Sequence, residues 1–407
     1  SRLCAKRCPH RRPLRPGSLL FDPVFSNPLI ERDTVKTSLI HRIPRRVVAS
    51  ALFAVASSAL LWSAASHAAD APAVIRIGSP DLGTGGKPSA SAGPLTVVQS
   101  HKWLEQEFAK DGIKIEWNFF RGAGPAIAEG LAARQLDVVF LGDLASVIGR
   151  ARGLPTKYIF ASGRGTNSYL ATAPGVDIKT VADLKGKKVS VLKGTAYQRP
   201  FDNLLASAGL TEKDVKLINL DWPSSKSAVV AKEIDATFGG SDLFLLKDKG
   251  VNIPISTKGR GAEFKIDAGV LATEDFIAKY PEVAGRLVKQ LVRAAHFASQ
   301  ESNREAFIKL SVEHSGNPEL GIRAEFEGEN LKARFSPLID NDLVADYQRV
   351  VDEGLKLGLI KQGFAVKEWF APQFVQQAVK DLKLEKFWTE LDAQGQAVGK
   401  AVKPKAK

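Results

Sequence analysis

The chain has 407 residues, of which 44% are hydrophobic and 25% are charged, so it is long enough for two or three globular units with buried cores. Its formal net charge is +13, but the first 69 residues hold 11 basic and 3 acidic residues, and the remainder holds 46 and 41, a net charge of +5. The position of this positive charge argues against a nucleic-acid-binding protein, because most of the excess basic residues precede the predicted globular part. Both cysteines lie in the first ten residues, and beyond residue 69 the histidines are His101, His296 and His314. We therefore expect no disulfide, no metal site and no cofactor.

Residues 1–68 are predicted to be a leader that ends in a signal peptide. Arginines at 42, 45 and 46 precede an apolar run at 47–61, and Ser66-His67-Ala68 supplies the small residues of a cleavage site. A retained membrane anchor is the alternative, which the Ala- and Ser-rich composition of the run disfavours. Cleavage near Ala68 predicts a periplasmic protein, with Sec or twin-arginine export left open. Residues 1–40 lie upstream of a complete signal and are set aside as a mis-called start.

Residues 69–165 alternate between strand and helix patterns, which predicts a mostly parallel sheet with crossover helices. Strands are expected at 74–78, 113–120, 137–141 and 157–161, and helices at 94–109 and 122–134. A second unit at 166–260 repeats the alternation. Its strands are expected at 189–192, 215–219, 236–238 and 251–256, and its helices at 194–208 and 224–232.

Residues 261–330 are predicted to return to the first unit through a strand near Gly269 and helices at 280–299 and 304–314. Residues 331–395 should form C-terminal helices that pack on both units, with helices at 342–357, 374–382 and 385–391, and 396–407 should form a basic flexible tail. The expected fold class is therefore α/β with two lobes, each a mostly parallel sheet flanked by helices. The polar, glycine-containing segments 162–168 and 256–261 would cross between the lobes and act as hinges.

Small and polar residues follow five of the predicted strands, at the edge of the sheet where α/β proteins bind ligands. The segments are 79–81, 122–124, 142–144, 193–197 and 239–242. The strongest is Lys193-Gly194-Thr195-Ala196-Tyr197, because its glycine allows close approach of the backbone and a helix start behind it offers free N–H groups to an anion. Lys193 and Arg199 would raise the local positive potential. The plainer interpretation is that each segment only ends a strand and caps a helix.

The candidate ligand-binding residues come from these segments and from the first crossing. They are Ser79, Pro80, Asp81, Gly142, Asp143, Leu144, Ser168, Gly194, Thr195, Ala196, Tyr197, Gly239, Gly240 and Ser241. Asp81, Asp143 and Asp242 could contact an ammonium group on a zwitterionic ligand or could simply cap helices. Trp117 and Trp222 are candidates for packing against a hydrocarbon tail.

Several segments resemble the sulfonate, taurine and nitrate branch of the ABC-importer binding proteins, which have the type 2 periplasmic-binding fold. They are IRIG at 75–78, LDVVFLGDLA at 136–145, ADLKGKKVSVLKGTA at 182–196 and the run from Gly269 to Ala295. The resemblance covers most of residues 74–300. It implies a ligand held between two lobes by loop backbone and helix starts, with Gly194, Thr195 and Ala196 meeting the anion opposite the residues near Asp143. It also implies delivery to a permease in the inner membrane.

The leading hypothesis is therefore binding without chemistry, with alkanesulfonates, taurine or sulfate esters as ligands and a monomer as the functional form. Nitrate, bicarbonate and thiamine precursors are alternatives, because related branches bind them. An enzyme on the same fold, desulfinase-like or pyrimidine-forming, is a hypothesis of another class. It is disfavoured because the mature part has no cysteine and its histidines lie outside the five segments. A sensor input domain would need a retained anchor and a signalling domain, and the sequence indicates neither.

Overall fold

The computed structural model describes residues 71–80, 83–84, 87–90 and 93–398, which belong to one compact unit, Ala68–Lys407. The predicted leader and signal peptide lie outside the described residues, as do Asp81 and residues 399–407 of the predicted tail. None of the helices within the described ranges combines the length and the hydropathy that a membrane span needs.

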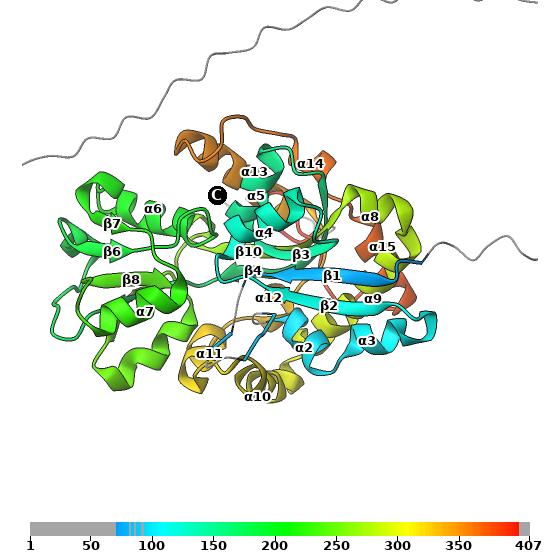
Figure 1. Ribbon diagram of the computed structural model, residues 1–407, viewed down its shortest axis with the longest axis horizontal. Helices are drawn as coiled ribbons and strands as arrows, with labels where there is room; N and C mark the ends of the chain where they lie inside the picture. The colour runs from blue at the N-terminus through cyan, green and yellow to red at the C-terminus, as the bar shows by residue number, and fades with distance from the viewer. Residues whose placement is uncertain (1–70, 81–82, 85–86, 91–92, 399–407) are drawn as a thin grey trace, which may run out of the picture. The chain divides into compact units, whose positions relative to one another are not determined.

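The first of two five-stranded sheets is built mainly from the N-terminal part of this unit (Figure 1). Its strand order is β2 (Lys114–Phe119), β1 (Val74–Ser79), β3 (Val138–Gly142), β10 (Ile266–Thr273) and β4 (Thr156–Thr166). β1 pairs in parallel with β2 and β3, whereas β10 is antiparallel to both β3 and β4. Four strands thus run in one direction, as expected for a mostly parallel sheet, and β10 opposes them.

The second sheet has the same plan. Its order is β7 (Lys216–Ile218), β6 (Lys188–Ser190), β8 (Ala236–Gly239), β5 (Tyr169–Thr172) and β9 (Asn252–Ser256). β6 is parallel to β7 and β8, and β5 is antiparallel to β8 and β9. In each sheet the one opposed strand is therefore the strand that follows a crossing from the other sheet. The predicted α/β class with two helix-flanked sheets is confirmed.

Helices connect the strands and form the C-terminal part of the chain. The α-helices are α2 (Pro94–Ser100), α3 (Trp103–Phe108), α4 (Ala123–Ala132), α5 (Asp143–Ala151), α6 (Gln198–Ser207), α7 (Trp222–Val230), α8 (Glu274–Lys279), α9 (Pro281–Ser299), α10 (Arg304–Ser315), α11 (Glu319–Phe326), α12 (Leu331–Arg334), α13 (Asn341–Lys356), α14 (Val366–Trp369) and α15 (Gln373–Asp381). Short 3₁₀ helices are η1 (Ala109–Asp111), η2 (Val181–Leu184), η3 (Glu212–Asp214), η4 (Ser241–Lys249), η5 (Ala262–Phe264) and η6 (Glu301–Asn303).

Both faces of the centre of the first sheet are buried, which explains why β3, VVFLG, is a continuous apolar run. In β3, Val138 and Phe140 face a core formed with α2, α3, α9 and α15, whereas Val139 and Leu141 face a core formed with α4, α5 and α13. The second sheet is covered in the same way, by α6 on one face and by α7 and η4 on the other. The helices that start after β2, β3, β6, β7 and β8 therefore pack on these faces, and the carboxyl ends of those strands are where the chain can form a site.

Two predicted helices differ from the structure. The helix expected at 94–109 is divided into α2 and α3, because Lys102 adopts a left-handed conformation with φ 54°. The helix expected at 385–391 is wrong. Lys383, with φ 57°, ends the helical run, and Trp388 turns inward, where its Nε1 donates to Ser299 Oγ at 3.1 Å. Burial of this indole holds the segment in turns rather than in a helix.

Two connections join the sheets. Between β4 and β5 only residues 167–168 are outside strands, and between β9 and β10 the connection spans residues 257–265. Most of the predicted hinge at 162–168 therefore belongs to β4, whose pairing with β10 includes Ala268↔Gly163 and Ile266↔Thr166. The part of the chain that can act as a pivot is shorter than the glycine-rich sequence indicated.

Candidate ligand-binding site

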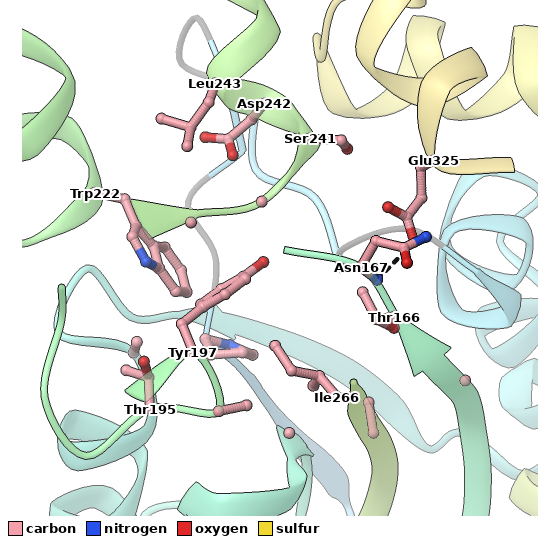
Figure 2. A pocket seen from close by; sticks show the side chains of 18 of the residues that line it. Thr166, Asn167, Thr195, Tyr197, Trp222, Ser241, Asp242, Leu243, Ile266 and Glu325 are labelled. Atoms are coloured by element: carbon pink, nitrogen blue, oxygen red, sulfur yellow. Dashed lines mark hydrogen bonds between the residues drawn. The ribbon is translucent and has the colours of Figure 1, made fainter. Parts of the chain in front are cut away.

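A cavity of about 170 Å³ lies between the two sheets and is lined by residues of both. Of the predicted ligand-binding residues, those that line it are Pro80, Gly142, Thr195, Ala196, Tyr197, Gly239, Gly240 and Ser241. Figure 2 shows Trp222 and Tyr197 facing each other on one side, with Thr166, Asn167 and Glu325 on the other. The rings of Tyr197 and Trp222 are perpendicular, with centroids 6.0 Å apart. The structure thus brings segments that are distant in the sequence to one cavity, with an aromatic wall and a polar wall.

Five helix starts meet at this cavity, two beside the first sheet and three beside the second. α4 and α5 follow β2 and β3, while α6, α7 and η4 follow β6, β7 and β8. The first residues of each helix, or those just before it, line the cavity, for example Gly124, Gly142 and Trp222. Helix starts present N–H groups without intrahelical acceptors and a partial positive charge, so several of them together form an anion site without a net charge on side chains.

The charged side chains among the described lining residues form two ion pairs. Lys226 Nζ lies 2.5 Å from Asp242 Oδ2, and Arg334 pairs with Glu325. Glu325 is 4% exposed and also accepts hydrogen bonds from Tyr169 Oη at 2.8 Å and from the backbone N–H of Asn167 at 3.1 Å. The charges on these lining side chains therefore cancel. The Asp242 carboxylate, which was considered as a contact for a ligand ammonium group, is already paired with Lys226.

The remaining predicted residues do not line the cavity. Gly194 lies beside it with φ +74°, and a Cβ there would meet Pro125 at 3.3 Å. Ser79 and Ser168 are fully buried in or next to strands, and Leu144 is part of the core around α5. Asp143 is also fully buried. Its Oδ1 accepts a hydrogen bond from the Leu144 N–H, and its Oδ2 accepts one from Arg199. Asp81 lies outside the described residues.

Lys193 and Arg199 were expected to raise the potential at the anion site, and the structure corrects this. Lys193 pairs with Glu212 at 2.8 Å, and Arg199 is 2% exposed, pairs with Asp143 and Glu353, and is not among the residues that line the cavity. Trp222 lines the cavity as one of two aromatic candidates, whereas Trp117 packs against the first core and donates to Glu105 at 3.0 Å. The polarity of the cavity thus comes from backbone and paired side chains.

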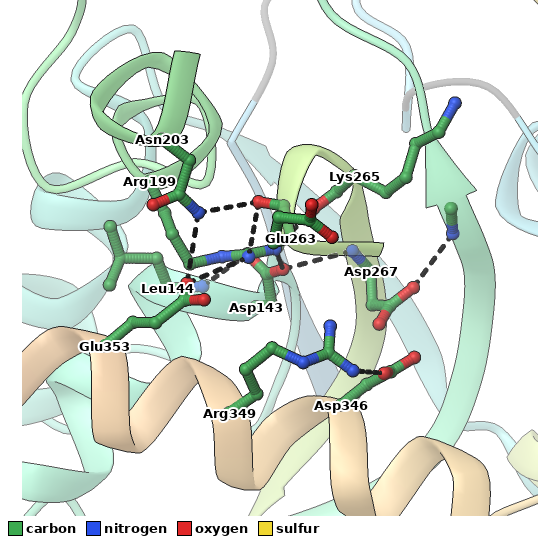
Figure 3. Close-up of polar contacts among 12 residues, drawn as sticks. Asp143, Leu144, Arg199, Asn203, Glu263, Lys265, Asp267, Asp346, Arg349 and Glu353 are labelled. Atoms are coloured by element: carbon green, nitrogen blue, oxygen red, sulfur yellow. Dashed lines mark hydrogen bonds and ion pairs between the residues drawn. The ribbon is translucent and has the colours of Figure 1, made fainter. Parts of the chain in front are cut away.

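Arg199 joins elements of both sheets in a buried network behind the cavity (Figure 3). From α6, its guanidinium donates to Asp143 Oδ2 of α5 at 3.0 Å and to Glu353 Oε2 of α13 at 3.1 Å. It also donates to the carbonyl oxygens of Glu263 and Lys265 in the second connection. Burial raises the pKa of the Asp143 carboxyl, although Arg199 counteracts this effect. One side chain therefore ties the two sheets and one connecting segment together.

Asp267 lies next to this network in β10, where burial and the neighbouring Asp346 and Asp143 raise its pKa to about 7. An unfolded aspartate titrates near pH 4, so between about pH 4 and 7 the folded protein binds more protons at this site than the unfolded one. The stabilising contribution of the protonated form is complete below pH 4 and is lost as the pH rises through 7. Asp202 adds a second contribution of the same sign, because burial and Glu212 raise its pKa to about 7.

Replacing Asp267 by asparagine is expected to stabilise the protein at pH 8 by about 1–3 kcal/mol and to leave stability at pH 4 nearly unchanged. The amide keeps an acceptor for the Gly165 N–H, which now donates to Asp267 Oδ1 at 2.8 Å. The measurement is the melting temperature from pH 4 to 9, with exposed Asp248→Asn as the control. Parallel pH profiles for the Asp267 variant and the unmodified protein would contradict the raised pKa.

Three close contacts join segments next to the first sheet with segments next to the second. Two of them leave no room for an added side chain, and the third is an ion pair. A Cβ on Gly142 would lie 2.4 Å from Ala196 Cβ, and a Cβ on Gly321 would lie 2.1 Å from the Ser241 carbonyl oxygen. At the surface, Arg121 Nε donates to Asp221 Oδ2 at 2.7 Å. Burial acts to raise the pKa of Asp221, but hydrogen bonds from Arg121 and Ser224 lower it to about 2. These contacts hold the two sides close together.

The sequence did not identify the polar wall of the cavity as part of a site. Ser162, Thr166 and Asn167 line it, but their segment was predicted to be a hinge. Glu325 and Arg334 come from α11 and α12, short helices that carry no sequence signal for a site. Lys226 could have been found, because it follows Trp222 by one turn of α7 and so lies on the same face of that helix.

Comparisons with known proteins show what this chain is similar to. The family model described as NMT1/THI5 like matches residues 107–304. The periplasmic sulfonate-binding protein SsuA of a sulfonate ABC transporter from Methylobacillus flagellatus KT is 34% identical, with a TM-score of 0.65, over 78% of this chain and 97% of its own. An aliphatic sulfonate-binding protein of Bacillus subtilis is 25% identical over 72% of this chain and 86% of its own. A cysteine-to-serine mutant of the desulfurization enzyme DSZB, in complex with biphenyl-2-sulfinic acid, is 14% identical with a TM-score of 0.57, over 76% of this chain and 99% of its own, which is a likeness of fold alone.

Proposed function

Because the chain belongs to the family of the periplasmic sulfonate-binding proteins, we propose that it captures a small oxidised-sulfur anion for an ABC importer. The ligand class is an alkanesulfonate, taurine or a sulfate ester. The observation that carries the proposal is the meeting of five helix starts at one cavity between the sheets. Each sulfonate oxygen can accept hydrogen bonds from backbone N–H groups of the lining residues at these starts, Gly124 and Gly142 on one side and Thr195 and Ala196 on the other.

In this proposal the two sheets are the cores of two lobes, with residues 69–165 and 261–330 in one and 166–260 in the other. The ligand fills the space between them and adds contacts to both, so it favours the closed arrangement that the permease recognises. The leader is proposed to be a signal peptide cleaved after Ala68, which would release a monomer into the periplasm. The mass of the exported protein, measured after purification from the periplasm, tests the cleavage position.

A ligand screen by thermal shift tests the function. The panel contains alkanesulfonates, taurine, sulfate esters, sulfate, nitrate, bicarbonate and thiamine precursors. A ligand present at one hundred times its Kd should stabilise the folded protein by about 2.7 kcal/mol. Stabilisation by sulfonates or sulfate esters that are recovered unchanged supports the proposal. No response to any of these anions contradicts it, and turnover of any of them would indicate an enzyme.

Replacing Arg121 by alanine is expected to weaken sulfonate binding several-fold while leaving the melting temperature of the ligand-free protein almost unchanged. Its side chain is 58% exposed, so the pair with Asp221 contributes little to folding, but it links the segment after β2 of the first sheet to the segment after β7 of the second. The effect should shrink as salt is added, because exposed ion pairs are screened. Titration calorimetry at two salt concentrations measures it, with exposed Arg152→Ala as the control. Unchanged affinity would show that this pair does not contribute to closure.

A further inference from the structure

Ser162 places a buried hydroxyl without a partner at the wall of the cavity. The residue lies in β4, is 3% exposed and lines the cavity, and its Oγ has no hydrogen-bond partner. Among the described lining residues, Ser162 is the one with a buried side-chain polar atom that has no hydrogen-bond partner. Ser225 is a useful contrast, because it lines the same cavity but its Oγ donates to the Trp222 carbonyl oxygen at 3.0 Å.

The position of Ser162 separates it from the proposed site of the sulfonate. Ala268 of β10 pairs with Gly142 on one side and with Gly163 on the other, so these three residues form one row across the sheet. Gly163, the neighbour of Ser162, therefore lies two strand spacings from Gly142, roughly 10 Å. A sulfonate with a two- or three-carbon chain can bridge this separation when a hydrogen bond is added at each end.

The charges of the lining residues limit what the far end of the ligand can be. Asp242 is paired with Lys226, and Glu325 is paired with Arg334, so an ammonium group would find no unpaired carboxylate among the described lining residues. An alkyl end would leave the Ser162 hydroxyl buried without a partner, which is unfavourable. A neutral group that donates or accepts a hydrogen bond satisfies both conditions.

We propose that Ser162 binds a neutral hydrogen-bonding group, of which a hydroxyl is the simplest, on the end of the ligand opposite the sulfonate. The ligand class is then a hydroxy-substituted short-chain sulfonate rather than a plain alkanesulfonate or an aminosulfonate. This inference rests on the proposed function, because it assumes that the sulfonate is bound at the helix starts near Gly142. Ser162 is a specificity-determining residue in this arrangement.

The test uses ligands of equal size that differ only in the terminal group. 2-Hydroxyethanesulfonate, propane-1-sulfonate and 2-aminoethanesulfonate carry hydroxyl, methyl and ammonium ends, and their homologues with one more carbon repeat the series at a greater length. Calorimetry with the protein purified after export of the full chain gives six dissociation constants. We expect the hydroxyl ligand to bind about tenfold tighter than both of its isosteres at one of the two lengths.

The variant Ser162→Ala should lose this preference while binding the methyl ligands as before, and its melting temperature should not fall. Ser225→Ala should retain the preference, because its hydroxyl is already bonded within α7. A methyl or ammonium ligand that binds best at both lengths overturns the inference. An equal loss for all six ligands in Ser162→Ala also overturns it, because the hydroxyl would then contact the sulfonate. Binding of none of the six by the unmodified protein contradicts the sulfonate part of the proposed function itself.

Discussion

Replacing Arg199 by leucine is expected to lower the free energy of unfolding by about 3–5 kcal/mol, which is the usual cost of breaking a buried ion pair from one side. The guanidinium is 2% exposed, and its removal leaves the Asp143 carboxylate, which is fully buried, without its cationic partner. The carbonyl oxygens of Glu263 and Lys265 also lose a donor. Urea denaturation monitored by circular dichroism measures the change.

An exposed arginine with a similar number of partners provides the control. Arg323 is 45% exposed and pairs with Glu305 and Glu319, and Arg323→Leu should leave the melting temperature nearly unchanged, because solvent screens such pairs. The double variant Arg199→Leu with Asp143→Asn should lose less stability than the sum of the single changes, because it removes the unpaired charge. Equal losses in the Arg199 and Arg323 variants would mean that the buried network is not held together as described.

Replacing Gly142 by alanine is expected to weaken ligand binding about 10- to 100-fold, with little change in the melting temperature of the ligand-free protein. The added methyl group would lie 2.4 Å from Ala196 Cβ, which belongs to the segment before α6 on the opposite side of the cavity. The two sides can separate to relieve this clash, but the ligand then loses contacts with one of them. The backbone of Gly142, with φ −73° and ψ 164°, is accessible to alanine, so the effect is steric contact alone.

Gly163→Ala is the matched control, because this glycine lines the same cavity and the nearest atom to an added Cβ is 4.0 Å away. Its affinity should stay close to that of the unmodified protein. Adding Ala196→Gly to the Gly142 variant removes the opposing methyl group and should restore most of the affinity. If Gly142→Ala binds the ligand normally, the bound form does not bring these two residues as close as the structure has them.

Much of the fold could be predicted because burial on both faces of each sheet leaves a strong sequence pattern. The strands expected at 137–141 and 236–238 agree with β3 and β8 to within a residue or two. The end of β4 was missed, since its last residues, SGRGT, have the composition of a loop and are held in the sheet by pairing with β10. Tertiary contacts also determine the conformation of residues 385–391, where burial of Trp388 prevents the helix that local propensity favours.

The site could be predicted where it depends on the backbone and not where it depends on side-chain partners. Glycine and small residues after strands, as at Gly142 and Thr195–Tyr197, indicate helix starts at the edge of a sheet, and the cavity lies there. Arg199 illustrates the limit, since its place in the sequence beside the anion segment predicted a cation that raises the potential at the site. Its actual partners, Asp143 and Glu353, lie 56 and 154 residues away, and no spacing rule relates them.

The pairing of the charged side chains around the cavity has a kinetic consequence. Excess positive charge at a binding site accelerates the capture of anions, and this acceleration falls steeply as ionic strength rises. Lys226 and Arg334 each stand beside a carboxylate, so the cavity walls add little to such steering. Ionic strength should then change the association rate constant only slightly, and different anions should be distinguished by their dissociation rates. A binding protein of this design keeps its rate of uptake when the salinity of its surroundings changes.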